Sequence, residues 1–259
     1  MPVSLLESLP KLEIISVFGV GYDGVPIEYC RQRQIRVTNT PDVLTDDVAD
    51  IAVALILMTG RGLVRLNRFV HAGEWGKHGP ELTTKLAGKR VGILGLGRIG
   101  KAIAKRVTAM GMEVSYMGRN RQSAPYRYVS DLKVLATESD FLVVAVPGGA
   151  QTKNLVDVEV LAALGRKGTL INIARGSIID EAALIAALKT GAIKAAGLDV
   201  FANEPNIPVE FFSMENVVLL PHVGSATHET RKAMGDLCKA NLDAWFDTGN
   251  VLTLIPELS

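Results

Sequence analysis

The chain has 259 residues, with 28 Lys and Arg against 27 Asp and Glu, and a formal net charge of +1. Its 48% of hydrophobic and 21% of charged residues are ordinary for a globular protein and exclude a disordered or collagen-like chain. The balanced charge gives no reason to expect a nucleic acid or an anionic membrane as a partner.

The two cysteines, Cys30 and Cys238, are too few for a disulfide framework, and no Cys/His spacing predicts a metal site. We therefore expect two reduced thiols in a cytoplasmic protein. The longest uncharged apolar stretch covers residues 51–60, far short of the roughly 18 residues that a membrane span needs.

Short apolar runs alternate with helix-period segments along the chain, which predicts an α/β fold with a parallel sheet. One segment differs, because residues 46–70 read as a single long helix followed by a loop or arm at 71–80. The expected helices include 101–110 and 181–190. The expected strands are residues 13–17, 35–38, 90–94, 113–117, 141–146, 169–173, 195–200 and 216–220.

The strongest local motif is Gly95-Leu96-Gly97-Arg98-Ile99-Gly100, which lies between the strand at 90–94 and the helix at 101–110. Gly95 permits a tight turn, Gly97 lets a pyrophosphate approach the backbone, and Gly100 allows close packing of the helix on the strand. This context predicts a dinucleotide site at the start of the helix. The alternative is a tight turn without a ligand.

The turn after the next strand predicts which dinucleotide is bound. An NAD enzyme usually has an acidic residue about 20 positions after the first glycine, to hold the ribose hydroxyls. Here the turn reads Gly118-Arg119-Asn120-Arg121, with no acid. Because a guanidinium binds phosphate as a fork, we expect NADP(H) to be preferred, with Arg119 as the first contact and Arg121 as the second. NAD(H) remains the alternative, and a solvated basic turn is the reading without a ligand.

Three ionisable residues follow later strands, where ligands bind in a doubly wound sheet. Arg175 follows the strand at 169–173, Glu204 follows 195–200, and His222 follows 216–220. A single histidine in a loop would be weak evidence for a reaction site, because such a side chain is usually just solvated. Three such residues on the rim of a dinucleotide turn predict a reaction site.

The ordered motifs resemble the D-isomer-specific 2-hydroxyacid dehydrogenase family, in particular its glyoxylate/hydroxypyruvate reductase branch. They span nearly the whole chain and occur in the family's order. The matching stretches are Phe18-Gly19-Val20-Gly21-Tyr22-Asp23, Asn39-Thr40-Pro41, Asp46-Asp47-Val48-Ala49-Asp50, the glycine motif, Asn172-Ile173-Ala174-Arg175-Gly176, Gly197-Leu198-Asp199-Val200-Phe201 with Glu204-Pro205, and Pro221-His222-Val223-Gly224-Ser225.

The resemblance implies a reductase that transfers hydride from NADPH to a small 2-keto acid. Arg175 would bind the substrate's carboxylate and keto oxygen. His222 would be the general acid in reduction and the base in oxidation, and Glu204 would fix the tautomer of its ring. Backbone N–H groups at Val20 and Gly21 would also hold the carboxylate.

The resemblance also implies cofactor contacts beyond the glycine motif. Asp199 would orient the nicotinamide carboxamide, although an aspartate that caps a helix is the alternative. The remaining positions that match cofactor-lining residues of the family are Thr45, Asn120, Val146, Pro147, Thr152, Ile173, Gly224 and Ser225.

The resemblance divides the chain into two domains. Residues 1–40 and 230–259 would form a flavodoxin-like substrate domain that lacks about two βα units at its N-terminus, roughly 50 residues. Residues 41–229 would form the NAD(P)-binding Rossmann domain. The helix and arm at about 46–80 would join two copies as a homodimer, with Trp75 either reaching the neighbouring subunit or packing locally.

Two other readings stay open at this stage. One is a non-catalytic dinucleotide-binding or regulatory protein derived from the same family. The other, a phosphoglycerate dehydrogenase, is disfavoured because Gly118 stands where an acid is expected for NAD.

Overall fold

The computed structural model describes residues 1–258 and contains two compact units. The first is Met1–Asp47 with Ser225–Ser259, and the second is Val48–Gly224. The predicted domain limits, 1–40 with 230–259 and 41–229, differ from these by a few residues. The roles of the two units stay a prediction.

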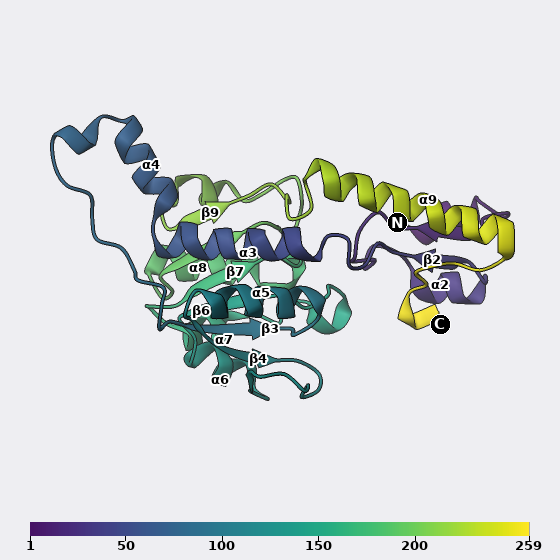
Figure 1. Cartoon of the computed structure of the whole chain (residues 1–259), viewed down its shortest axis with the longest axis horizontal. Coiled ribbons are helices and arrows are strands. Elements are labelled where there is room, and N and C mark those ends of the chain that lie inside the picture. Colours follow the sequence, from purple (N-terminus) through teal and green to yellow (C-terminus); the bar gives the residue numbers. More distant parts are fainter. Residues whose placement is uncertain (259) are drawn as a thin grey trace. The chain divides into compact units, whose positions relative to one another are not determined.

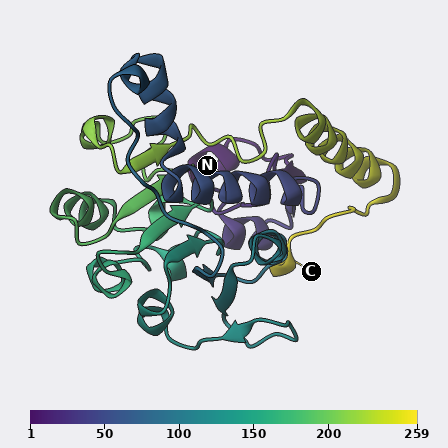
Figure 2. The same cartoon turned by 60° about the vertical axis from the view of Figure 1, so that its left-hand side comes forward.

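The second unit is built on a parallel sheet of seven strands in the order β5-β4-β3-β6-β7-β8-β9. Figure 2 shows α6, α7 and α8 on one face of this sheet and α3 with α5 on the other. The predicted doubly wound α/β fold is confirmed. Its strands are β3 (Arg90–Leu94), β4 (Glu113–Met117), β5 (Arg127–Tyr128), β6 (Phe141–Val144), β7 (Thr169–Asn172), β8 (Ala195–Leu198) and β9 (Val217–Leu219). Its helices are α3 (Thr45–Gly60), which begins in the first unit, α4 (Leu63–His71), α5 (Arg98–Ala109), α6 (Leu132–Thr137), α7 (Val158–Leu164) and α8 (Glu181–Thr190).

The central strands are buried on both faces, as their continuous apolar runs predict. Every residue of β6, β7 and β8 is buried. Gly197 in β8 shows how closely α3 approaches, since a Cβ there would lie 3.0 Å from the Cβ of Leu55. Strand order reverses between β3 and β6, so the carboxyl ends of these two strands form the switch point where ligands bind in such sheets.

The predicted single helix at 46–70 is wrong. The structure has two helices, because Gly62 adopts a left-handed conformation with φ of +60° and ends the regular geometry after α3. No residue of α4 is buried, and in Figure 1 this helix extends away from the sheet of its unit. The expected arm is interrupted by one short 3₁₀ turn, η1 (Glu74–Gly76).

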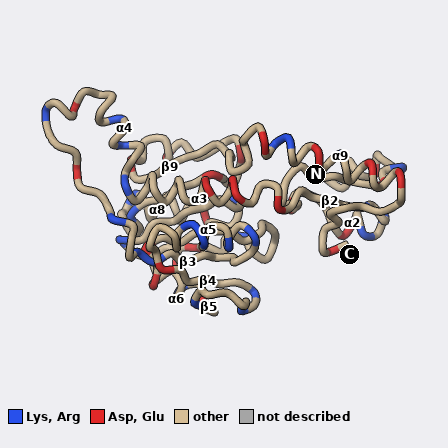
Figure 3. Tube along the Cα trace, in the orientation of Figure 1, with Lys and Arg blue, Asp and Glu red and all other residues tan. Residues whose placement is uncertain are grey.

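The first unit contains a two-stranded parallel sheet, β1 (Ile14–Ser16) with β2 (Arg36–Thr38). The long helix α9 bears ion pairs between Lys232 and Asp236 and between Lys239 and Asp243, and Figure 3 shows both charge signs along it. The helices of this unit are α1 (Val3–Glu7), α2 (Ile27–Gln32) and α9 (His228–Thr248).

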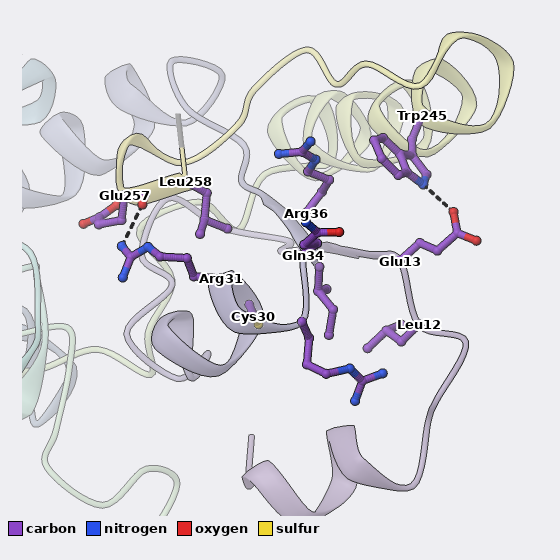
Figure 4. Close-up of a pocket in the computed structure, with 11 residues that line it drawn as sticks. Leu12, Glu13, Cys30, Arg31, Gln34, Arg36, Trp245, Glu257 and Leu258 are labelled. Atoms are coloured by element: carbon purple, nitrogen blue, oxygen red, sulfur yellow. Dashed lines mark hydrogen bonds between the residues drawn. The ribbon is translucent and has the colours of Figure 1, made fainter.

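A cavity of about 640 Å³ lies within the first unit, at the amino ends of β1 and β2. Figure 4 shows Trp245 donating to Glu13, at 3.0 Å, and Arg31 donating to the backbone of Glu257, at 2.8 Å. Ligands of parallel sheets bind at the opposite, carboxyl ends of strands. None of the predicted site residues lines this cavity.

Among the described residues, no helix has the length and hydrophobicity that a membrane span requires. Short 3₁₀ turns complete the described chain. The remaining turns are η2 (Ala150–Thr152), η3 (Gly176–Ile178), η4 (Val209–Ser213) and η5 (Pro256–Leu258).

Candidate active site

The glycine motif forms the turn between β3 and α5. Gly95 has a φ of +102°, and a Cβ there would lie 2.8 Å from the backbone of Ala145. A Cβ on Gly100 would lie 2.0 Å from the carbonyl oxygen of Gly95. At Gly97, by contrast, no atom lies within 4 Å of the Cβ position. Gly95 and Gly100 are therefore required by packing, whereas Gly97 borders open space at the start of a helix. That combination fits the pyrophosphate of a dinucleotide.

The basic turn after β4 is exposed at Arg119, Asn120 and Arg121. It is tied to the glycine turn through Gln122, whose side-chain amide donates to the carbonyl oxygen of Leu96 at 2.9 Å. The backbone N–H of Gln122 also donates to the Tyr116 hydroxyl at 2.7 Å. Sequence reasoning missed Gln122, because nothing in its local pattern indicates this contact. The two guanidinium groups thus stand on a loop fixed beside the dinucleotide turn.

The loop after β6 faces the same switch point. A Cβ on Gly95 would lie 2.8 Å from Cγ1 of Val146, and Thr152 donates its hydroxyl to the Pro147 carbonyl at 2.8 Å. Val146 is therefore brought to the glycine turn, as its predicted cofactor role requires. Ile173 is buried directly after β7.

Arg175 stands on the turn after β7, and Asn172 ties that turn together. Asn172 is fully buried, and its side chain donates to the Arg175 carbonyl at 2.9 Å. Its Oδ1 accepts from the N–H of Ala174 at 3.1 Å. A Cβ on Gly176 would lie 1.8 Å from the carbonyl carbon of Phe201, so only glycine lets this turn lie against the next one.

Glu204 and His222 form the hydrogen-bonded pair that the resemblance implies. Nδ1 of His222 lies 2.7 Å from Oε2 of Glu204, and the other carboxylate oxygen accepts from the N–H of Phe201 at 2.8 Å. The carboxylate is thus fixed by the segment that also backs the Arg175 turn. Nδ1 faces this carboxylate, so the second ring nitrogen, Nε2, is the one that a substrate can use.

Asp199 holds the backbone of the histidine turn. His222 has a φ of +54°, an uncommon conformation for a residue with a side chain. Asp199 is buried, and its two oxygens accept the N–H groups of Val223 at 2.8 Å and Gly224 at 2.9 Å. Burial raises the pKa of Asp199 above its ordinary value, while these two N–H donors act in the opposite direction. No helix begins at Asp199, so the capping alternative is wrong. Its predicted contact with a nicotinamide stays a prediction.

The remaining predicted residues, Val20, Gly21, Thr45 and Ser225, belong to the first unit. There Asn39 donates its side-chain amide to the Val20 carbonyl at 2.9 Å, and thus holds the loop predicted to bind a carboxylate. Among residues 1–258, no group of three or more His, Cys, Asp and Glu side chains could hold a metal ion.

Comparison with known proteins places this geometry among enzymes. Residues 53–224 match the family model of the D-isomer specific 2-hydroxyacid dehydrogenase, NAD binding domain. A glyoxylate/hydroxypyruvate reductase A of Arabidopsis thaliana is 52% identical over 250 residues, covering 96% of this chain and 80% of that protein. The 2-ketogluconate reductase of Gluconobacter oxydans is 48% identical and is covered to 82%.

A solved structure extends the likeness to three dimensions. The NADPH-dependent glyoxylate/hydroxypyruvate reductase of Sinorhizobium meliloti, in complex with NADP and malonate, aligns with a TM-score of 0.96 and 50% identity. The alignment covers 99% of this chain and 82% of that protein.

Proposed function

Because the chain belongs to the D-isomer specific 2-hydroxyacid dehydrogenase family, we propose that it reduces a small 2-keto acid with NADPH. The substrate is of the hydroxypyruvate or glyoxylate type and the product is the D-2-hydroxy acid. The family predicted from the motifs is confirmed, as is its oxidoreductase class. The observation that carries the proposal is the pair of His222 and Glu204, 2.7 Å apart, in the same unit as the glycine turn.

Three side chains of this protein have separate roles in the proposed reaction. NADPH, when bound at the glycine turn, would supply the hydride that the keto carbon accepts. Arg175 binds the substrate carboxylate and polarises the carbonyl, because a guanidinium presents two N–H donors as a fork. His222 donates a proton from Nε2 to the carbonyl oxygen as the carbon is reduced, and takes it back in the reverse direction. Glu204 orients the ring and fixes its tautomer through the contact at Nδ1.

The basic turn supports NADPH over NADH. Arg119 and Arg121 are exposed, and no acidic residue in the turn opposes a 2′-phosphate. Among residues 1–258, neither guanidinium has an ion pair with a carboxylate. We therefore assign the 2′-phosphate contact to Arg119 first and to Arg121 second, with NAD(H) as the weaker cofactor.

The deciding experiment follows NADPH oxidation with hydroxypyruvate and with glyoxylate, with NADH in parallel. We expect turnover with NADPH to exceed turnover with NADH, and His222→Ala to abolish it while leaving NADPH binding intact. NADPH binding without turnover of either keto acid would instead favour a non-catalytic dinucleotide-binding protein.

The arm supports assembly as a homodimer. Trp75 is 68% exposed and Val70 is 53% exposed, and no residue of α4 is buried in the chain itself. Apolar side chains gathered on an extended segment usually mark an interface. We expect a dimer by light scattering and a shift to monomer in Val70→Asp; a monomeric wild-type chain would refute the assignment. The cytoplasmic location expected from the two thiols stays a prediction.

A further inference from the structure

Asn172 is the last residue of β7, and its carboxamide lies inside the turn that carries Arg175. The side chain uses both of its hydrogen-bonding functions within that turn. Its Nδ2 donates to the Arg175 carbonyl at 2.9 Å, and its Oδ1 accepts from the Ala174 N–H at 3.1 Å. Because the residue is fully buried, water cannot replace either bond. The carboxamide therefore holds the backbone on both sides of the peptide bond that joins Ala174 to Arg175.

The guanidinium of Arg175 depends on the same short segment. Its Nη1 donates to the Ala174 carbonyl at 2.8 Å. Ala174 thus has its N–H held by Asn172 and its carbonyl used by the arginine head. A rotation of this backbone would move both the Cβ of Arg175 and a carbonyl to which its guanidinium donates.

Two further contacts prevent the turn from moving as a rigid body. The carbonyl of Asn172 accepts from the N–H of Asp199 at 3.0 Å, which joins the end of β7 to the end of β8. On the other side, Gly176 lies directly against the backbone of Phe201. The carboxamide therefore acts inside a turn that is flanked by this bond to β8 and by close backbone packing against Phe201.

We propose that Asn172 is a positioning residue for Arg175, which sets the direction of the guanidinium toward the substrate carboxylate. This inference rests on the proposed function. It predicts that loss of the carboxamide weakens the binding of a carboxylate ligand, because bidentate binding requires a fixed fork. Binding of the dinucleotide should not change, because both hydrogen bonds of the Asn172 side chain lie within the turn after β7.

The test uses Asn172→Ala in the full chain, with malonate as the carboxylate probe in the presence of NADP. Calorimetry gives the Kd of malonate, fluorescence gives the Kd of NADPH, and steady-state kinetics gives kcat and KM for hydroxypyruvate. We expect the Kd of malonate and the KM to rise at least tenfold, with the Kd of NADPH within about twofold of wild type. If the alanine variant folds poorly, Asn172→Asp replaces it, because aspartate keeps the shape of the side chain but loses the N–H donor. The Kd of malonate and the KM should rise in this variant too.

Ser139→Ala is the matched control. Ser139 is also buried, and its hydroxyl donates to the Leu135 carbonyl at 2.6 Å. It lies just before the amino end of β6, whereas Asn172 lies at the carboxyl end of the neighbouring strand β7. The control variant should lower the melting temperature without changing the Kd of malonate. A merely structural role for Asn172 would give the two variants the same pattern and would overturn the inference.

A double-mutant cycle separates this inference from the proposed function. In an Arg175→Ala background, Asn172→Ala should weaken malonate binding no further, because the group that it positions is gone. An additional loss would overturn the positioning role. A wild-type chain that binds malonate but reduces no keto acid refutes the proposed function alone. A wild-type chain that binds no malonate refutes the carboxylate site, and the role of Asn172 with it.

Discussion

The glycine turn allows packing and ligand binding to be separated with two alanine substitutions. Gly100→Ala places a methyl group 2.0 Å from the carbonyl oxygen of Gly95, in a direction blocked by backbone. Real contacts of this kind are not shorter than 3.0 Å, so α5 and the turn must separate by about 1 Å. Gly97→Ala places the same methyl group in open space.

The expected magnitudes follow from these environments. Overpacking of this kind costs about 1–3 kcal/mol. In a domain of this size each kcal/mol lowers the Tm by roughly 2–4 °C, so Gly100→Ala should lose about 4–8 °C for a 2 kcal/mol penalty. At Gly97, with φ of −75° and ψ of −164°, alanine is allowed. Alanine stabilises the protein by restricting the unfolded chain, and destabilises it because alanine is a poorer N-cap residue than glycine. These two effects nearly cancel, so the Tm should change by less than about 2 °C.

Cofactor binding should respond differently. Gly97→Ala fills the space through which the pyrophosphate approaches, so we expect at least a tenfold rise in the Kd of NADPH, about 1.4 kcal/mol. Gly100→Ala should weaken binding and stability together. Scanning calorimetry without cofactor and fluorescence titration with NADPH measure the two effects. Wild-type affinity in Gly97→Ala would refute the assignment of this space to the dinucleotide.

Three further predictions address specificity, the proton donor and the sheet. Arg119→Asp should lower the ratio of NADPH to NADH efficiency by about tenfold or more, because a charge-assisted phosphate contact is lost and repulsion is added; Arg121→Asp should lower it less. Glu204→Gln should lower kcat by about 100-fold while leaving the Kd of NADPH unchanged, since the carboxylate holds the ring that donates the proton. Asp140→Asn should destabilise the protein at pH 7 but progressively less toward pH 3, as measured by urea unfolding. Burial would raise the pKa of Asp140, but the backbone N–H and guanidinium of Arg90 outweigh it and lower that pKa. The ionised Asp140 carboxylate therefore stabilises the folded protein fully above the pKa of about 3.9 that it has in the unfolded chain. This stabilisation is lost as the pH falls through the lower pKa that Asp140 has in the folded protein.

Each of these predictions has an outcome that would contradict it. An unchanged ratio of NADPH to NADH efficiency in Arg119→Asp would mean that the basic turn is a solvated loop that does not bind the 2′-phosphate. Wild-type kcat in Glu204→Gln would mean that the pairing with His222 has no part in proton transfer. A stability difference for Asp140→Asn that stays constant from pH 7 to pH 3 would exclude the ionised carboxylate as its cause.

Local patterns in the sequence predicted most of the sheet and the reacting groups. The apolar run of β3 gave that strand with its observed limits, because strands covered on both faces carry few polar residues. β4 also has its predicted limits, although only one of its five residues is buried. Motif spacing placed Arg175, Glu204 and His222 after three neighbouring strands. Parallel strands end at one edge, so these three residues were expected on one rim of the sheet. The family resemblance, in turn, implied the pairing of Glu204 with His222 that the structure shows.

The predictions failed or were silent at two places where the local apolar pattern does not determine the structure. The break at Gly62 was missed because the apolar period of α3 runs on past Gly60. The edge strand β5, of two residues, has no pattern of its own and is defined by its pairing with β4.

The sequence by itself determined the family and the parallel fold and predicted which side chains react, since these depend on residue type and spacing. Only the tertiary structure decided how those side chains are held. Asn172, Asp199 and Gln122 each bond to backbone groups of turns that the fold brings together. A buried polar group must find such a partner, and the three-dimensional arrangement of the strand ends determines which one it finds.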